Sequence, residues 1–154
     1  MKYYHSWEEL NSNVATICQQ MAVDGYKPDV IVGPGRGGYI MGVMLSHYFD
    51  VPFEGFNLSL RDHVIADFPA LTHILSKYNG KNILICDDLN DTGQTLTYID
   101  GVVTENDLTL APKYCTIYDK LSSNFGKKVD YTAKEVGYAT DKHWIVFPYE
   151  EWWK

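Results

Sequence analysis

Residues 82–96 constrain the fold of this chain more than any other stretch. The run 83–86 is wholly apolar and is typical of a buried strand in a parallel sheet. The adjacent carboxylates Asp87 and Asp88 follow it, then Asp91, then small residues and the start of a helical pattern. A strand that leads through a glycine-containing turn into a helix forms an anion site, because backbone N–H groups and the helix dipole point the same way. Three acids would repel a bare phosphate, so the stretch predicts a ligand that also brings hydroxyl groups and a divalent cation.

Length, charge and cysteine content exclude several classes of protein. At 154 residues the chain predicts a single domain over residues 1–154 with a core of its own. The formal net charge of −7 argues against nucleic-acid binding, which needs a basic face. No apolar run approaches the length of a membrane span or resembles a secretion signal, so we expect no membrane partner. The scattered cysteines Cys18, Cys86 and Cys115 indicate reduced thiols in a cytoplasmic protein.

Apolar periodicity and turn residues predict alternating strands and helices. Helices are expected from Ser6 to Gly25, over 39–48, from about 71 to 78 and over 95–105, and strands over 29–32, 53–60, 83–86, 113–118, 133–136 and 144–147. This alternation predicts an α/β domain with a mostly parallel sheet flanked by helices. Ligands bind such sheets at the carboxyl ends of the strands. Residues 61–68 lack periodicity, and we interpret them as a mobile lid loop.

A second glycine-rich segment, residues 33–38, lies between a predicted strand and a predicted helix. Its glycines Gly33, Gly35 and Gly38 match the dinucleotide-binding pattern. One of the two arginines in the chain, Arg36, lies within it, although backbone groups bind the pyrophosphate in dinucleotide loops. A bare tight turn does not explain the arginine either. We therefore rank a phosphate or pyrophosphate loop first, a bare turn second and a dinucleotide site third.

Two shorter matches carry little weight. Residues 91–93 form the Asp-Thr-Gly triplet of aspartic proteases, but three residues recur by chance and such a protease needs two copies in an all-β setting. The acids at 87, 88 and 91 do not fit a calcium loop, because the glycine and the closing glutamate are misplaced.

Residues 83–95 resemble the phosphoribosyl-pyrophosphate (PRPP) signature of the type I phosphoribosyltransferases. That signature has four apolar residues, two acids and two variable residues, and then an acid with a small-residue phosphate loop. The resemblance extends over most of the chain and is closest to the short purine-salvage enzymes of the xanthine–guanine and hypoxanthine–guanine type. In those enzymes an Arg-Gly-Gly loop binds pyrophosphate, which residues 35–38 resemble. The family fold also implies a small hood formed by the C-terminal segment.

The resemblance implies a role for each part of the PRPP site. Asp87 and Asp88 would bind the ribose hydroxyls and would hold a Mg²⁺ ion, to which Asp88 would lie nearest. Arg36 would stabilise the departing pyrophosphate, and Asp91 would act as general base or bind purine N7. The implied PRPP-binding residues are Gly35, Arg36, Gly37, Asp87, Asp88, Asp91, Thr92, Gly93, Gln94, Thr95 and, from the lid, Arg61.

For the base, the resemblance implies three residues besides Asp91. Lys120 would contact the exocyclic oxygen of a purine, Trp144 would stack on the ring, and Ile145 would bind the base through its backbone. The plain alternatives are a solvated lysine at a strand end and a tryptophan buried in strand packing. The chain departs from its relatives where leucine follows Lys120 and where Arg61 is the one basic residue near the start of the lid.

The implied activity is a Mg²⁺-dependent transfer of phosphoribosyl from PRPP to a 6-oxopurine (guanine, xanthine or hypoxanthine), with release of pyrophosphate. A homodimer or homotetramer is expected by the same resemblance. Alternatives are a phosphoribosyltransferase for another base such as a pyrimidine, a non-catalytic PRPP or nucleotide sensor with this fold, and a small dinucleotide-binding oxidoreductase.

Overall fold

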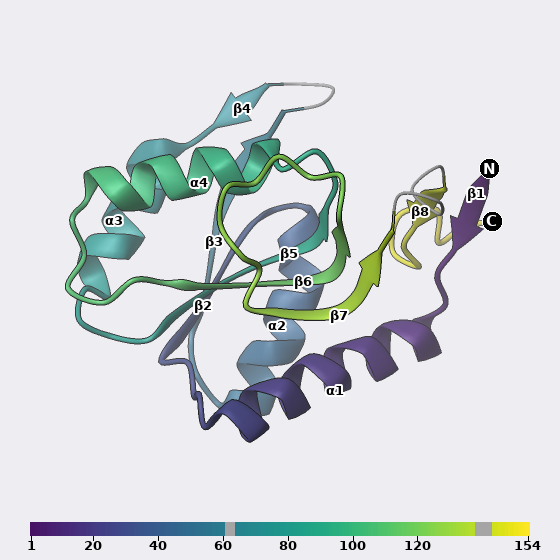
Figure 1. The fold of residues 1–154 in the computed structure, drawn as a ribbon, viewed down its shortest axis with the longest axis horizontal. Helices are drawn as coiled ribbons and strands as arrows, with labels where there is room; N and C mark the ends of the chain where they lie inside the picture. The colour runs from purple at the N-terminus through teal and green to yellow at the C-terminus, as the bar shows by residue number, and fades with distance from the viewer. Residues whose placement is uncertain (61–63, 138–142) are drawn as a thin grey trace.

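A computed structural model describes residues 1–60, 64–137 and 143–154 (Figure 1). The elements follow in the order β1 (Lys2–Tyr4), α1 (Trp7–Asp24), β2 (Val30–Gly35), α2 (Gly37–Phe49), β3 (Phe53–Ser59), β4 (Ile65–Ala66), α3 (Phe68–Lys77), β5 (Ile83–Asn90), α4 (Gln94–Glu105), β6 (Lys113–Lys120), β7 (Tyr131–Val136) and β8 (Trp144–Val146). The predicted α/β class is confirmed. Within the described ranges, no helix is both long enough and apolar enough to cross a membrane.

A six-stranded sheet in the order β4-β3-β2-β5-β6-β7 forms the centre of the molecule. Its strands are parallel except for β4, a short edge strand that runs antiparallel to β3. β5 lies between β2 and β6, with Ile31 beside Leu84 and Cys86 beside Cys115. The carboxyl ends of β2, β5 and β6 therefore lie next to one another, and the predicted glycine-rich and acidic loops begin there.

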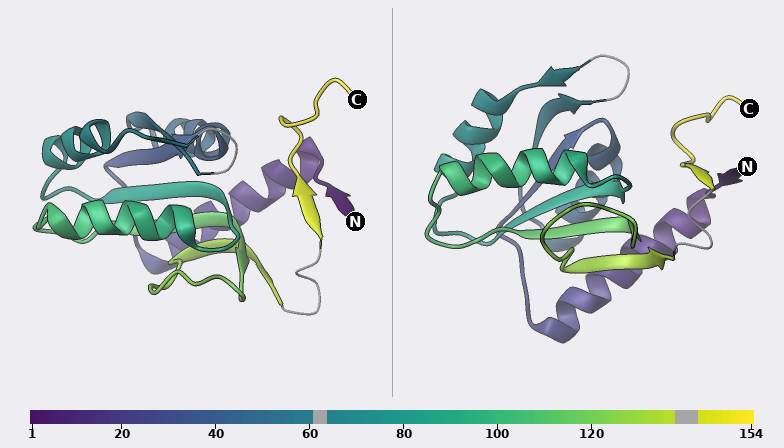
Figure 2. Two further views of the ribbon diagram at one scale, coloured as in Figure 1. Left: turned by 90° about the horizontal axis from the view of Figure 1, so that it is seen from above. Right: turned by 45° about the horizontal axis from the view of Figure 1, so that its top comes forward.

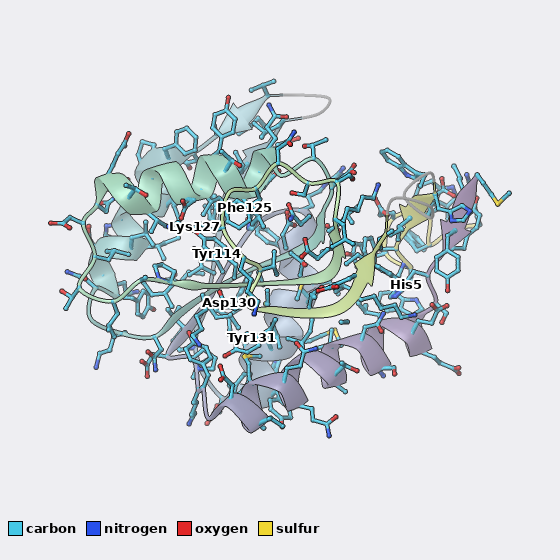
Figure 3. The ribbon with its side chains drawn as sticks, in the orientation of Figure 1. His5, Tyr114, Phe125, Lys127, Asp130 and Tyr131 are labelled. Carbon is cyan, nitrogen blue, oxygen red and sulfur yellow. The ribbon has the colours of Figure 1, made fainter. Side chains whose placement is uncertain are left out.

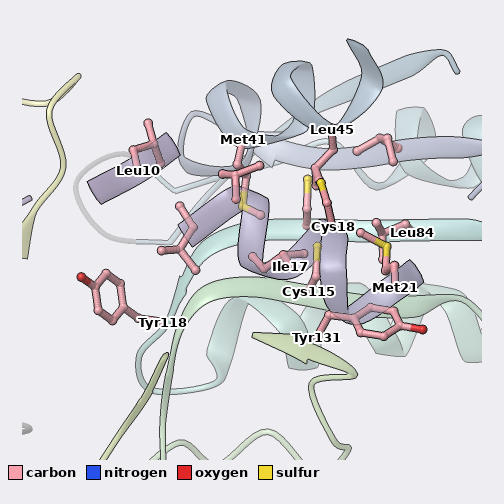
Figure 4. Close-up of a cluster of buried hydrophobic side chains, with 14 of the residues drawn as sticks. Leu10, Ile17, Cys18, Met21, Met41, Leu45, Leu84, Cys115, Tyr118 and Tyr131 are labelled. Carbon is pink, nitrogen blue, oxygen red and sulfur yellow. The ribbon is translucent and has the colours of Figure 1, made fainter. Parts of the chain in front are cut away.

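Helices cover both faces of the sheet, and each face has its own apolar core (Figure 1 and Figure 2). On one face α1 and α2 pack over side chains that include Ile17, Met41 and Leu84 (Figure 4). On the other face α3 and α4 contribute to a core that includes Leu75 and Ile85. Neighbouring residues of β5 point to opposite faces, as the two-residue period of a strand requires. Burial on both faces explains why this strand is continuously apolar up to the acids.

Local hydrogen bonds define the helix ends that the sequence predicts. The Ser6 hydroxyl accepts a hydrogen bond from the Glu9 N–H at 3.1 Å, and the Glu9 carboxylate accepts one from the Ser6 N–H at 3.4 Å. This is the predicted capping box. Gly25 ends α1 at φ +68°, a conformation that favours glycine. Asp67 caps α3 by accepting a hydrogen bond from the Ala70 N–H at 3.1 Å.

Several element boundaries differ from the prediction, and two of the differences bear on the predicted site. β5 continues beyond the apolar run to Asn90, because Leu89 and Asn90 still pair with β6. The acid pair therefore lies on the strand and not after it. Within the segment expected to be a loop, residues 65–66 form β4 because they pair with Leu58 and Ser59. Arg61, the expected lid residue, lies outside the described residues.

The two ends of the chain form a separate two-stranded sheet. β1 and β8 run parallel, with Lys2 beside Trp144 and Tyr4 beside Val146. They lie together beyond the amino-terminal end of α1, away from the main sheet (Figure 2). We call β1, β8 and residues 147–154 the hood. The sequence predicted its C-terminal part but not β1, which is three exposed residues without an apolar pattern.

His5 lies where the hood meets the main body (Figure 3). Its side chain is only 3% exposed and packs edge-on against Tyr118 and Phe147. Its Nε2 lies 2.9 Å from the side-chain amide nitrogen of Asn13 on α1. Because burial removes water from the charged imidazolium, the pKa of His5 lies below its usual value.

His5 should make the protein less stable in acid. A histidine in the unfolded chain binds its proton at about pH 6.5, whereas His5 in the folded protein binds its proton only at a lower pH. The unfolded state then binds more protons as the pH falls through this window, so the free energy of unfolding decreases. We expect the melting temperature of the wild type to fall between pH 7 and pH 5 by about 2 °C more than that of His5→Gln.

His73→Gln, on the exposed side of α3, is the matched control and should keep the wild-type pH dependence. Parallel melting curves against pH for the wild type and His5→Gln would contradict this interpretation.

Candidate active site

The carboxyl ends of β2 and β5 bring the glycine-rich loop (residues 33–38) against the acid pair. A Cβ on Gly37 would lie 2.8 Å from Asp88 Oδ1 and 2.9 Å from Asp87 Oδ1. Real Cβ atoms essentially never approach other atoms this closely, so a side chain at position 37 would force the two carboxylates to shift. Two stretches that the sequence marked separately therefore form one site.

Asp87 and Asp88 are adjacent but have different surroundings. Asp87 is buried, and its Oδ1 accepts a hydrogen bond from the Asp88 N–H at 2.9 Å. Burial and, after it, the charge of Asp88 raise the pKa of Asp87 well above its usual value. The partly buried Asp88 accepts a hydrogen bond at Oδ2 from the Tyr149 hydroxyl at 2.9 Å. Two carboxylates this close destabilise each other, and a cation or donated hydroxyl groups would relieve that cost.

Arg36 lies at the start of α2, directly before the glycine that packs on the acids. It is exposed, and the Gly35–Arg36 peptide bond is cis. The loop also packs tightly on β5, because a Cβ on Gly38 would lie 2.5 Å from the Cys86 carbonyl oxygen. The backbone thus places the predicted pyrophosphate residues Gly35, Arg36 and Gly37 next to the predicted ribose and metal residues.

Residues 91–93 form the turn between β5 and α4, and residues 94–95 begin the helix, as expected for an anion site. Gly93 is the N-cap of α4 with φ +90°, where a side chain would be strained. The Gln94 N–H donates to the Thr92 hydroxyl at 3.3 Å. Thr95 follows in the first turn of α4, whose N–H groups have no partner within the helix and are suited to bind an anion.

The segment 121–126, which the sequence analysis did not single out, packs on this turn. A Cβ on Gly93 would clash with the backbone of the segment. The Asn124 N–H donates to a carbonyl of the turn at 2.8 Å, and the Ser123 hydroxyl donates to Asn90 Oδ1 at 3.0 Å. These contacts hold the segment against the turn. Its polar, irregular sequence contains no periodic pattern that would have predicted this packing.

Asp91 and Lys120 come from neighbouring strand ends and form an ion pair. Lys120 Nζ lies 2.8 Å from Asp91 Oδ1, and the lysine is only 9% exposed. The interpretation of Lys120 as a solvated lysine is therefore wrong. A buried ammonium group needs a nearby carboxylate to offset its lost hydration, and Asp91 supplies it. The structure thus joins two of the residues predicted to contact a base.

The other two predicted base residues, Trp144 and Ile145, lie on β8 in the hood. Trp144 is 47% exposed, so its ring is not buried in strand packing, while Ile145 is buried. The hood reaches the acid pair through Tyr149, which contacts Asp88. Sequence reasoning missed Tyr149, because its partner lies 61 residues away and no local pattern marks the contact.

The acid pair fits a magnesium ion that is held mainly by substrate. Within the described ranges no three His, Cys, Asp or Glu side chains are grouped as a metal cage. Mg²⁺ commonly uses one or two carboxylates together with substrate phosphates and water. Asp87 and Asp88 offer that donor set.

Two cavities lie elsewhere, toward the amino-terminal ends of β6 and β7 (Figure 3). The larger, of about 510 Å³, lies between α1 and residues that include Lys113, Lys128 and Tyr131, and the smaller is about 230 Å³. Asp24, Lys113 and Tyr131 hydrogen-bond to one another at the larger cavity. Neither cavity is lined by a predicted site residue.

Comparison with known proteins agrees with this geometry. The phosphoribosyl transferase domain family matches residues 2–151. A xanthine-guanine phosphoribosyltransferase from Idiomarina loihiensis is 25% identical over 97% of this chain and 87% of its own length. A hypoxanthine-guanine phosphoribosyltransferase from Schizosaccharomyces pombe is 26% identical over 64% of this chain, which aligns with 57% of that longer protein. The crystal structure of a purine phosphoribosyltransferase from Pyrococcus horikoshii has a TM-score of 0.73 and 26% identity, covering 97% of this chain and 94% of that one.

The fold and the site define a phosphoribosyltransferase-type α/β domain. Because the family match spans nearly the whole sequence, the chain belongs to the phosphoribosyl transferase domain family, a family of pentosyltransferases. The family resemblance drawn from residues 83–95 is confirmed.

Asp87→Asn should stabilise the ligand-free protein while weakening its binding of Mg²⁺ with PRPP. The amide keeps an acceptor for the Asp88 N–H but removes a carboxyl group that is buried beside a second carboxylate. We expect the melting temperature at pH 7.5 to rise by about 3 °C, equivalent to about 1 kcal/mol in a domain of this size. Calorimetric affinity for PRPP in the presence of Mg²⁺ should fall by about tenfold or more.

Asp107→Asn provides the control, because Asp107 is exposed and its left-handed backbone also suits asparagine. A lower melting temperature for Asp87→Asn would show that the buried acid stabilises the ligand-free fold.

Proposed function

We propose that this protein is a Mg²⁺-dependent phosphoribosyltransferase that transfers the phosphoribosyl group of PRPP to a 6-oxopurine. The observation that carries the proposal is the packing of the Gly37 backbone on Asp87 and Asp88, next to the Asp91–Lys120 ion pair. This arrangement places an arginine, two carboxylates, a helix N-terminus and a charged pair at adjoining strand ends. PRPP and a purine need that combination of groups.

The PRPP-binding half of the proposal assigns each anionic group to a separate part of the site. The turn at residues 91–95 binds the 5′-phosphate through backbone N–H groups and threonine hydroxyls. Asp87 and Asp88 accept hydrogen bonds from the ribose hydroxyls, and Arg36 binds the pyrophosphate. Asp87 and Asp88 would hold Mg²⁺, which would supply positive charge to stabilise the leaving pyrophosphate. Arg61 of the lid is proposed to add a further contact to pyrophosphate.

The proposed reaction forms a bond between purine N9 and C1 of the ribose while the bond from C1 to the pyrophosphate oxygen breaks. The transition state resembles an oxocarbenium ion, as in glycoside chemistry. The electron pair of the broken bond leaves with pyrophosphate, where Arg36 stabilises it. After this bond forms, the imidazole ring of the purine still carries a proton on N7, and N7 donates that proton to Asp91.

The Asp91–Lys120 pair supports a 6-oxopurine over a 6-aminopurine. Its cation and anion lie 2.8 Å apart, and the purine edge presents N7 beside the group on C6. A lysine donor complements an oxygen at C6 and opposes an amino group there. Trp144 would stack on the ring, and the backbone of Ile145 would contact its other edge.

The direct test is to incubate the protein with PRPP, Mg²⁺ and guanine, hypoxanthine, xanthine, adenine or uracil, and to measure pyrophosphate and nucleotide. We expect turnover with at least one 6-oxopurine and at least about 100-fold less with adenine, because a missing hydrogen-bond match discriminates strongly. Turnover of uracil alone would assign another base. Calorimetric binding of PRPP without turnover of any base would support a sensor, and NAD binding without a response to PRPP would support an oxidoreductase.

Asp91→Asn tests the general base. Asparagine keeps the size of the side chain but cannot accept a proton, so we expect kcat to fall by about 100-fold. Asp107→Asn, which changes an exposed aspartate, should retain wild-type kcat. Near-normal nucleotide formation by Asp91→Asn would remove Asp91 from this role.

Arg36→Ala tests stabilisation of the leaving group. An interaction that strengthens as charge develops lowers kcat when it is lost, so we expect about 100-fold lower kcat with a KM for the base within about threefold. Lys81→Ala, which removes a cation at the opposite end of β5, should be neutral. An equal loss in kcat and in base binding would contradict a transition-state role.

Assembly and location remain part of the proposal. We propose a homodimer or homotetramer, supported by the exposed aromatic side chains Trp152 and Trp153 at the end of the hood. A cytoplasmic location is supported by free, buried thiols at Cys18, Cys86 and Cys115.

A further inference from the structure

The Tyr149 side chain links the hood to the acid pair. Its hydroxyl donates to Asp88 Oδ2 at 2.9 Å. Its ring stacks on Phe147, with centroids 5.5 Å apart and planes 1° from parallel, and lies 6.4 Å from the Trp7 ring of α1. Aromatic contacts therefore hold the ring on two sides, and its single polar atom meets the carboxylate.

A tight turn fixes the segment from which Tyr149 projects. The Phe147 N–H donates to the Glu150 carboxylate at 2.6 Å, and the Glu150 N–H donates back to the Phe147 carbonyl at 3.0 Å. Phe147 is itself buried against His5 and Tyr118. The phenol is thus anchored by β8 and by the main body together, and little freedom remains for its hydroxyl.

The two oxygens of Asp88 have different neighbours. Oδ1 lies 2.8 Å from the position of a Cβ on Gly37, so it faces the glycine-rich loop, while Oδ2 takes the Tyr149 hydrogen bond. The Tyr149 phenol is the donor of this hydrogen bond, because an ionised carboxylate can only accept. The Tyr149 hydrogen bond therefore restricts the rotation of this carboxylate.

We propose that Tyr149 is a positioning residue that orients Asp88 for the ribose hydroxyls and the metal. This inference rests on the proposed function, because it assigns Asp88 to the binding of PRPP. A carboxylate held by a charge-assisted hydrogen bond is ordered before the ligand arrives, so less freedom is lost on binding. Without the hydroxyl, Asp88 loses this restraint, and more of its freedom is lost when the ligand binds.

Tyr149→Phe removes the hydroxyl and keeps the stacked ring. In calorimetry with PRPP and Mg²⁺ we expect about tenfold weaker binding than in the wild type. In turnover, KM for PRPP should rise by a similar factor while KM for the base stays within about twofold. Ligand-free melting should change little, and the rise in melting temperature caused by PRPP with Mg²⁺ should shrink.

Tyr118→Phe is the matched control. Tyr118 also packs on Phe147 and is buried, but its hydroxyl has no hydrogen-bond partner among the described residues. It should bind PRPP as the wild type does. Equal loss in both variants would assign the effect to hood packing, and wild-type affinity in Tyr149→Phe would also overturn the inference.

The failure of this inference differs from the failure of the proposed function. If wild-type protein binds no PRPP with Mg²⁺ in the calorimeter, the proposed function is wrong and the role of Tyr149 falls with it. If the wild type binds and Tyr149→Phe binds equally well, only the positioning role is wrong.

Discussion

The contact between the Gly37 backbone and the carboxylates of Asp87 and Asp88 is the constraint on which the rest of the site depends. It joins the start of α2 to the end of β5 with no room for a side chain. Parallel pairing of β2 with β5 brings the two loops to the same edge, and glycine allows them to touch. Arg36 and the pair of acids come to one place at the edge of the sheet through this contact.

This contact has an electrostatic cost that the surroundings only partly offset. Asp87 is buried next to a second carboxylate, and its raised pKa records the unfavourable environment of its charge. The Asp88 N–H and the Tyr149 hydroxyl each stabilise one carboxylate. The two carboxylates therefore keep an unfavourable interaction between their charges, which a bound cation would relieve.

Much of the architecture follows from signals that span a few residues. The start of α1 at Ser6, its end at Gly25 and the apolar run of β5 were all predicted, because each depends on neighbours within one turn or one strand. The end of β5 was not, because Leu89 and Asn90 pair with β6 and that partner is not visible in the local pattern. β1 was missed for the same reason, since its pairing partner β8 lies at the other end of the chain.

By itself, the sequence determined the α/β class, the family and the two loops that carry the charged residues. Residue order alone sets these features, because hydrophobic period, glycine spacing and adjacent acids are local properties. Only the tertiary structure decided that Lys120 is buried against Asp91, that segment 121–126 covers the turn after β5, and that Tyr149 donates to Asp88. These are contacts between groups far apart in the chain, and they exist because strand order and the pairing of the two termini bring those groups within hydrogen-bond distance.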